Sequence, residues 1–142
     1  MPRGEPSPQR PLTIGRLARL AGVGVETVRY YERRGLIERP RERRGAFRVY
    51  PPEAVGRLRA IKRAQRLGFS LEEIRGLLEF RLRDRARCGD VLRRAEGKLA
   101  EIEEKIRALQ RMRRELRALA AACRGDAPAS LCPVLAAFEK PD

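Results

Sequence analysis

Three cysteines, Cys88, Cys123 and Cys132, are the residues of this 142-residue chain whose types best suit chemistry. The chain has no histidine, which excludes Ser-His-Asp and Cys-His catalysis in their usual forms. The cysteine number is odd and no two form a CxxC pair, so we expect no disulfide framework and a reducing, cytoplasmic compartment. Thiolates are soft ligands that select soft metal ions. The three thiols are therefore either candidate metal ligands or ordinary buried cysteines.

The number and softness of the ligands indicate which metal this set would hold. A structural zinc site takes four ligands, and here the fourth cannot be histidine. Three thiolates suit Hg(II) better than Zn(II). The neighbouring Arg87 and Arg124 are expected to lower the pKa of the thiols. A redox sensor is a weaker hypothesis, because the thiols have no CxxC-type partner.

An apolar heptad repeat connects two of the cysteines. Apolar residues recur at alternating steps of three and four, with one polar interruption at Arg113. This pattern predicts a long helix that needs a partner, and a homodimer is the simplest partner; the alternative is that it folds back on its own N-terminal domain. The residues expected to form the dimer contact are Leu92, Ala95, Leu99, Ile102, Ile106, Leu109 and Leu116.

The cysteines fall in the register of this repeat. Cys88 and Cys123 are 35 residues, or five heptads, apart, so they share a face but lie roughly 52 Å apart along one helix. In an antiparallel dimer, Cys88 of one chain can approach Cys123 of the other. The loop at 124–128 contains Gly125 and Pro128 and can fold Cys132 back beside Cys123. We expect two three-thiol sites per dimer, each shared between the chains and each holding one Hg(II).

The charge distribution indicates a polyanionic partner for the N-terminal half. The formal net charge is +14, and residues 1–66 carry 17 basic and 6 acidic side chains against 16 and 13 in residues 67–142. Double-stranded DNA is the favoured partner, and an anionic membrane surface is the alternative.

Two short helices around a glycine-bearing turn predict a helix-turn-helix in this basic half. Thr13 can cap the first helix, Gly22-Val23-Gly24 breaks it, and the second runs from about Val25 to Arg34 as the recognition helix. One of Tyr30 and Tyr31 is expected to pack inward while the other donates its hydroxyl to a phosphate. The candidate DNA contacts in this segment are Thr13, Arg16, Glu26, Thr27, Arg29, Tyr30, Tyr31 and Arg34. A purely structural helical hairpin is the alternative.

A basic hairpin is predicted directly after the recognition helix. The segment Ile37–Tyr50 is rich in arginine, Arg44-Gly45 suits a turn, and Phe47 to Tyr50 is strand-like. Such a wing could follow phosphates or enter the minor groove, and Arg43, Arg44, Arg48 and Tyr50 are its candidate DNA contacts. A solvated run of charges is the alternative.

A second pair of helices completes the predicted domain. Pro52 and Glu53 suit a helix start, and Ser70 with Glu73 forms a capping box for the next helix. The chain is therefore predicted to be mainly α: a leader at 1–11, a winged helix-turn-helix domain at 12–82, an antiparallel coiled-coil dimerisation helix at 83–123, and a metal-binding loop with a short helix at 124–142. The leader contains no apolar segment typical of a secretory signal, and no stretch is long enough to span a membrane.

Two other function classes are less well supported. An enzyme is not expected, because the chain has no histidine, no phosphate-binding glycine loop and no paired acid site. A structural DNA-binding protein would bind without sequence preference and ignore metals, whereas a regulator would bind its own site far more tightly than other DNA.

The chain resembles the MerR family of bacterial transcription regulators along nearly all of residues 12–139. The resemblance is carried jointly by LTIGRLARLAGVGVETVRYYERRGLI, the RVY that closes the wing, LGFSLEEI and the long helix. Within the family, the cysteine gaps of 35 and 9 and the CPVLAAF ending resemble members that respond to mercuric ion. The resemblance therefore implies Hg(II) as the effector, with Pb(II), Cd(II) and Zn(II) as alternatives. The chain departs from the family pattern in its longer leader and in lacking a histidine between the last two cysteines.

The resemblance implies a mechanism that the residues alone do not give. A homodimer would sit on a two-fold symmetric operator in a promoter whose spacer is too long. Without metal it would hold the DNA repressed. With Hg(II) bound by Cys88 of one chain and Cys123 and Cys132 of the other, it would untwist the DNA so that RNA polymerase engages the promoter of mercury-resistance genes.

Overall fold

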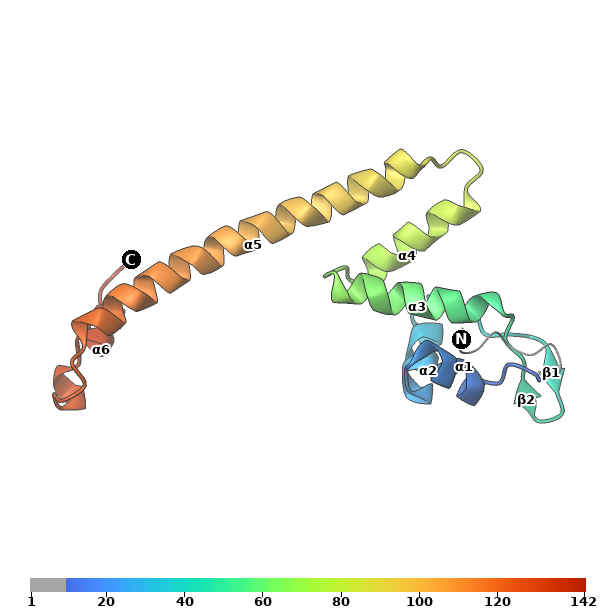
Figure 1. The fold of residues 1–142 in the computed structure, drawn as a ribbon, viewed down its shortest axis with the longest axis horizontal. Coiled ribbons are helices and arrows are strands. Elements are labelled where there is room, and N and C mark those ends of the chain that lie inside the picture. The colour runs from blue at the N-terminus through green and yellow to red at the C-terminus, as the bar shows by residue number, and fades with distance from the viewer. Residues whose placement is uncertain (1–9) are drawn as a thin grey trace, which may run out of the picture. The chain divides into compact units, whose positions relative to one another are not determined.

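The computed structural model describes residues 10–142, so the predicted leader at 1–11 lies almost wholly outside the described residues. The chain divides into two compact units, one ending at Arg94 and the other comprising Ala95–Asp142 (Figure 1). The first contains α1 (Ile14–Ala21), α2 (Val25–Arg33), β1 (Arg43–Arg44), β2 (Phe47–Arg48), α3 (Glu53–Arg66), α4 (Leu71–Glu79), η1 (Phe80–Leu82) and the first residues of α5 (Cys88–Ala122). The second contains the rest of α5, η2 (Ala129–Leu131) and α6 (Pro133–Phe138).

Helices α1 and α2 begin and end where the sequence predicts. The Thr13 hydroxyl accepts a hydrogen bond from the Arg16 amide at 3.4 Å and so caps α1. Gly22 ends α1 with a φ of +70°, a left-handed conformation in which its amide bonds to carbonyls of the last turn. Helix α2 starts only two residues later, at Val25, and the two helices pack together as a helix-turn-helix.

The second strand of the wing, β2, is shorter than the strand predicted for Phe47 to Tyr50. Strands β1 and β2 are antiparallel and only two residues each, with Arg44 opposite Phe47 and Gly45 at a φ of +61° in the turn. The Val49 amide still bonds to the Glu42 carbonyl at 2.9 Å, and the backbone then leaves the hairpin, where the Tyr50 amide bonds to the carbonyl of Leu12 at 2.8 Å. This pairing ties the base of the wing to the start of α1 and turns Tyr50 into the core.

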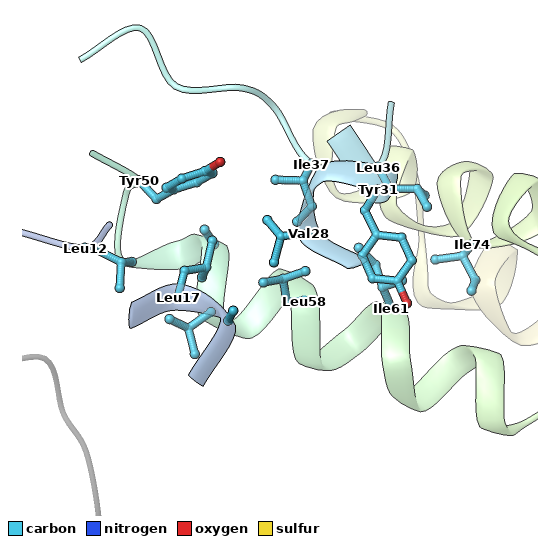
Figure 2. Close-up of a cluster of buried hydrophobic side chains, with 13 residues drawn as sticks. Leu12, Leu17, Val28, Tyr31, Leu36, Ile37, Tyr50, Leu58, Ile61 and Ile74 are labelled. Carbon is cyan, nitrogen blue, oxygen red and sulfur yellow. The ribbon is translucent and has the colours of Figure 1, made fainter. Parts of the chain in front are cut away.

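The core of the first unit is built around α3. Leu58 and Ile61 of α3 are fully buried and face side chains from α1 and α2 (Figure 2). Helix α4 adds Ile74, which is 1% exposed. The other buried apolar residues are Leu12, Leu17, Ala18, Val28, Tyr31, Leu36, Ile37, Tyr50, Ala54 and Val55.

The capping box predicted for α4 is present. The Ser70 hydroxyl accepts from the Glu73 amide at 3.1 Å, and the Glu73 carboxylate accepts from the Ser70 amide at 2.9 Å. Because two unpaired backbone donors are satisfied together, the helix has a defined start.

The long helix begins at Cys88, five residues later than the predicted segment 83–123. The Asp90 carboxylate accepts a hydrogen bond from the Arg87 amide at 2.7 Å, so the chain turns into α5 at this point. The helix ends at Ala122, and Gly125, with a φ of +80°, follows in the loop. Among residues 10–142, none of the helices has the length and apolar character needed to cross a membrane.

Candidate functional site

One face of α2 presents polar and aromatic side chains to solvent. Glu26, Arg29 and Tyr30 are exposed, and Thr27 is partly exposed. Arg29 forms an ion pair with Glu26 at 3.2 Å, one turn back on the same helix. The opposite face carries Val28 into the core, so α2 is held with this polar face outward, as a recognition helix requires.

The remaining polar candidates flank this face. The Arg16 guanidinium donates to the Arg10 carbonyl at 2.8 Å, while the Thr13 hydroxyl is occupied as the cap of α1. Arg34 is exposed at the C-terminal end of α2. In the wing, Arg43 and Arg44 are exposed.

Two predicted DNA contacts, Tyr31 and Tyr50, are wrong because both rings lie in the core. Each is 3% exposed. The Tyr31 hydroxyl donates to the side-chain oxygen of Gln65 at 2.5 Å, and the Tyr50 hydroxyl donates to the carboxylate of Glu32. Burial, followed by the hydrogen bond to Glu32, raises the pKa of Tyr50 far above its usual range, so its proton stays on the hydroxyl. Tyr30, at 42% exposed, is the one of the two neighbouring tyrosines that faces solvent.

Two further exposed side chains belong to the wing segment, although the sequence pattern does not mark them as DNA contacts. Arg39 is exposed at the start of the wing, and Phe47 is 64% exposed near its tip. The place of Arg39 in the arginine-rich segment could have indicated a contact. Phe47 is predicted to lie in a strand, and nothing in the sequence indicates that its ring faces solvent.

Two of the three cysteines line the same hollow. Cys123 and Cys132 both lie on the wall of a hollow of about 370 Å³ formed by the loop that connects α5 to α6. The backbone amides of Leu135 and Val134, and then the Cys123 thiol, lower the pKa of Cys132. The thiolate that a metal ion needs is therefore more accessible at Cys132 than in a free cysteine.

The third cysteine is the first residue of α5, whereas Cys123 directly follows the last. A helix of 35 residues is about 52 Å long, so Cys88 cannot join the other two thiols within one chain. Accordingly, no group of three candidate metal ligands gathers within one chain over residues 10–142. Three-thiol coordination would require a second chain.

The heptad repeat forms an apolar stripe along α5, here called the seam, and this seam is exposed to solvent. Ala95 is exposed, and the six larger residues expected at the dimer contact are 37–62% exposed: Leu92, Leu99, Ile102, Ile106, Leu109 and Leu116. Their heptad spacing places them on one continuous stripe of the helix. Such a stripe is the kind of surface that a second helix covers.

Comparisons with known proteins agree with this geometry. The family described as MerR HTH family regulatory protein matches residues 12–80, and the family described as MerR, DNA binding matches residues 55–119. The mercuric resistance operon regulatory protein of Pseudomonas fluorescens is 44% identical over 128 residues, which is 90% of this chain and 88% of that protein. This chain belongs to the MerR family of transcriptional regulators.

Solved structures of MerR-family regulators share the fold. The transcription regulator PbrR691 from Ralstonia metallidurans CH34, in complex with lead(II), is 33% identical with a TM-score of 0.81, covering 89% of this chain and 98% of that one. The regulator MerR from Bacillus megaterium MB1, in complex with mercury(II), is 36% identical with a TM-score of 0.68, covering 92% of this chain and all of that one. The predicted fold class, a mainly helical chain with a winged helix-turn-helix and a long C-terminal helix, is confirmed.

Proposed function

We propose that this MerR-family chain is a mercuric-ion-responsive regulator that binds promoter DNA as a homodimer in the bacterial cytoplasm. It represses without metal and activates mercury-resistance genes when Hg(II) is bound. The observation that supports the proposal is that Cys123 and Cys132 line one hollow at the end of α5, while Cys88 opens the same helix. The similarity to mercuric resistance regulators adds support.

The donor set fits a soft ion. Cys123 and Cys132 line one hollow, and the backbone amides of Leu135 and Val134 lower the pKa of Cys132 and so favour its thiolate. In an antiparallel dimer, the exposed seam of α5 would be covered by its copy, and Cys88 of the partner would complete the three ligands. When bound, Hg(II) would form strong bonds to the thiolates. Unfolded or dissociated chains would not hold the three thiolates in the same geometry, so metal binding would favour the folded dimer.

In the proposal, the response at the DNA comes from a coiled coil with two arrangements, and metal binding favours one of them. Each site would tie the start of one α5 to the end of the other, so metal binding would shift the coiled coil relative to both DNA-binding domains. The exposed polar face of α2 and the basic wing would hold each half of the operator. Untwisting of the DNA between the halves would let RNA polymerase engage the promoter.

The test is a titration of the reduced full-length protein with Hg(II), following the ultraviolet thiolate-to-metal absorption. We expect saturation at one or two Hg(II) per dimer, with no displacement by excess Zn(II). The C88S variant should lose tight Hg(II) binding and the transcriptional response, yet bind operator within about twofold of wild type. Loss of operator binding in C88S, with the fold intact, would contradict the assignment of Cys88 to metal rather than DNA.

A lead(II) sensor is the second candidate, because the solved structure with a TM-score of 0.81 holds lead(II). In the same titration, displacement of Hg(II) by equimolar Pb(II) would identify Pb(II) as the effector and would leave the proposed action on DNA unchanged. Failure of all these ions to bind would remove the metal proposal.

A further inference from the structure

The hollow that contains Cys123 and Cys132 has more room than a bare metal ion needs. Its volume is about 370 Å³, which falls within the range of roughly 300–1,000 Å³ typical of pockets for small organic molecules. A metal–thiolate bond is only about 2.3 Å long, so an ion at the two sulfurs would leave most of the hollow unfilled. The remaining space suits an organic group attached to the atom that the thiols bind.

The wall of this hollow is mainly apolar. Its two charged members, Arg124 and Asp126, lie in the loop after α5. The apolar members are Ala122, Ala127, Ala129, Leu131, Pro133 and Leu135. Both Leu131 and Leu135 are exposed, so they present apolar surface to an occupant. An apolar group that covered this surface would stabilise a complex.

Backbone hydrogen bonds fix both cysteines at the ends of helices. The Cys123 amide donates to the Ala120 carbonyl at 3.2 Å, directly after α5. The Cys132 amide donates to the Ala129 carbonyl at 3.1 Å, and the Cys132 carbonyl accepts from the Ala136 amide of α6 at 3.1 Å. The positions of these two cysteines therefore do not depend on a second chain, and together they offer a dithiol site within one chain.

The donor set on this wall consists of two soft sulfurs and no third soft ligand. Among the residues that line the hollow, Asp126 offers a carboxylate, which is a hard ligand that soft centres disfavour. The matching ligand has a soft centre with two open positions and a third position filled by an apolar group. Arsenic(III) with one organic substituent has this composition, because carbon takes one of its three bonds.

We propose that this hollow binds an organic arsenic(III) compound, R–As(OH)2, through Cys123 and Cys132, with the group R against Leu131 and Leu135. Two As–S bonds form and two As–O bonds break, and each thiol proton leaves with a hydroxide as water. Arsenic stays trivalent, so the step needs no oxidant or reductant. The inference rests on the proposed function, since it uses the same thiols as the site for a soft centre, and it adds a second class of ligand.

The bound arsenic would not connect two chains. Its third bond goes to carbon, so it has no position for the partner's Cys88, whereas a three-coordinate Hg(II) would take that thiol. In the proposed mechanism, metal acts by tying Cys88 of one chain to the loop of the other. An organic arsenic(III) compound therefore occupies Cys123 and Cys132 without shifting the coiled coil, and it suppresses the response to Hg(II).

The test titrates reduced full-length protein with phenylarsine oxide, which hydrates to the dihydroxide, and with inorganic arsenite, which has no apolar group. Native mass spectrometry and calorimetry measure the number bound and the affinity. We expect two phenylarsenic groups per dimer, with an affinity in Cys88→Ser within about threefold of wild type. Cys132→Ser should bind at least about 100-fold more weakly, because the loop no longer holds a second thiol at high effective concentration. Arsenite, which has three open positions, should lose tight binding in both variants.

A substitution in the wall tests where the organic group lies. Leu131→Asn should weaken phenylarsenic binding by roughly fivefold, because part of the ring then faces a polar side chain, and should leave methylarsenic(III) binding within about twofold of wild type. Leu82→Asn is the control, since Leu82 is exposed and lies outside the hollow, and it should change neither affinity. If Leu131→Asn affects the phenyl and methyl compounds alike, the organic group does not lie on this wall and the inference is wrong.

Transcription from an operator-bearing template tests the predicted block. Phenylarsine oxide added before Hg(II) should suppress the Hg(II) response, and phenylarsine oxide alone should leave transcription at the metal-free level. Activation by phenylarsine oxide alone would contradict the inference, because it would show that arsenic at these thiols shifts the coiled coil.

The outcomes also separate this inference from the proposed function. Equal loss of phenylarsenic binding in Cys88→Ser and Cys132→Ser would show that three thiols are required, and would overturn the inference. A wild-type protein that binds Hg(II) through all three cysteines but does not bind phenylarsine oxide would also overturn it, while the proposed function stands. Binding of phenylarsine oxide without tight binding of Hg(II) would contradict the proposed function and support the dithiol site.

Discussion

The two units of this chain use apolar residues in opposite ways. The unit that ends at Arg94 buries thirteen of them in one cluster around α3. In Ala95–Asp142 no apolar residue is buried, and only Lys98 is classed as buried. Leu58, at 0% exposed, and Leu109, at 62%, are the same residue type in these two settings.

The difference shows that a single chain buries the apolar residues of the first unit but leaves those of the second unit exposed. Removal of apolar surface from water is the main favourable term in folding, and the first unit obtains it internally. The stripe on α5 gains it only when another surface covers the helix. In the proposed antiparallel dimer, the same assembly would also bring the partner's Cys88 to Cys123 and Cys132. The proposal therefore ties the burial of this stripe and the binding of metal to one dimerisation step.

The largest effect is expected from a charge placed in the seam. Ile106→Asp should convert the dimer to monomer and weaken operator binding by more than about 100-fold, because a single DNA-binding domain reads only one half-site. Light scattering and fluorescence anisotropy measure the two effects. Lys105→Asp, one residue away, is the matched control. An Ile106→Asp protein that remains dimeric would show that the stripe is not the contact.

A smaller but still large effect is expected in the core. Leu58→Ala should lower the free energy of unfolding by about 2–5 kcal/mol, through lost burial and the cavity that remains. This loss should not depend on protein concentration, because the cavity lies within one chain. Leu109→Ala, in contrast, should lower stability in a concentration-dependent way, through dissociation. Thermal unfolding at several concentrations distinguishes the two variants, and identical behaviour would remove the contrast between the units.

The smallest effect concerns a tyrosine hydroxyl. Tyr31→Phe removes the hydrogen bond to Gln65, which should cost about 1 kcal/mol of stability and leave operator affinity unchanged. Tyr30→Phe should show the reverse, with unchanged stability and weaker DNA binding, because Tyr30 is exposed on α2. Chemical denaturation and anisotropy on the same samples are the measurements. A DNA-binding defect in Tyr31→Phe would reinstate it as a contact.

Local sequence patterns predicted the elements of this fold because their causes are local. Thr13 and Ser70 mark helix starts through bonds to amides three residues away. The heptad spacing likewise predicted α5, although its first residue depends on the Asp90 side chain.

Features that depend on distant residues were not predictable in the same way. Tyr50 turns inward because its amide pairs with the carbonyl of Leu12, far back in the chain, and its hydroxyl meets Glu32. The exposure of Phe47, at 64%, depends on which face of the wing meets the rest of the fold, which the local pattern does not show. The glycine- and proline-bearing loop predicted that Cys132 returns towards Cys123, and in the structure both line one hollow. That the two thiols hold one metal ion stays a prediction.

The central claim is that the metal site is shared between two chains, and mixed dimers test it most directly. C88S homodimers and C123S/C132S homodimers should each fail to bind Hg(II) tightly. Dimers formed by unfolding and refolding an equal mixture, then isolated through two different affinity tags, should each bind one Hg(II), because one complete three-thiol site is restored. Mixed dimers that bind no more Hg(II) than either parent would contradict a shared site.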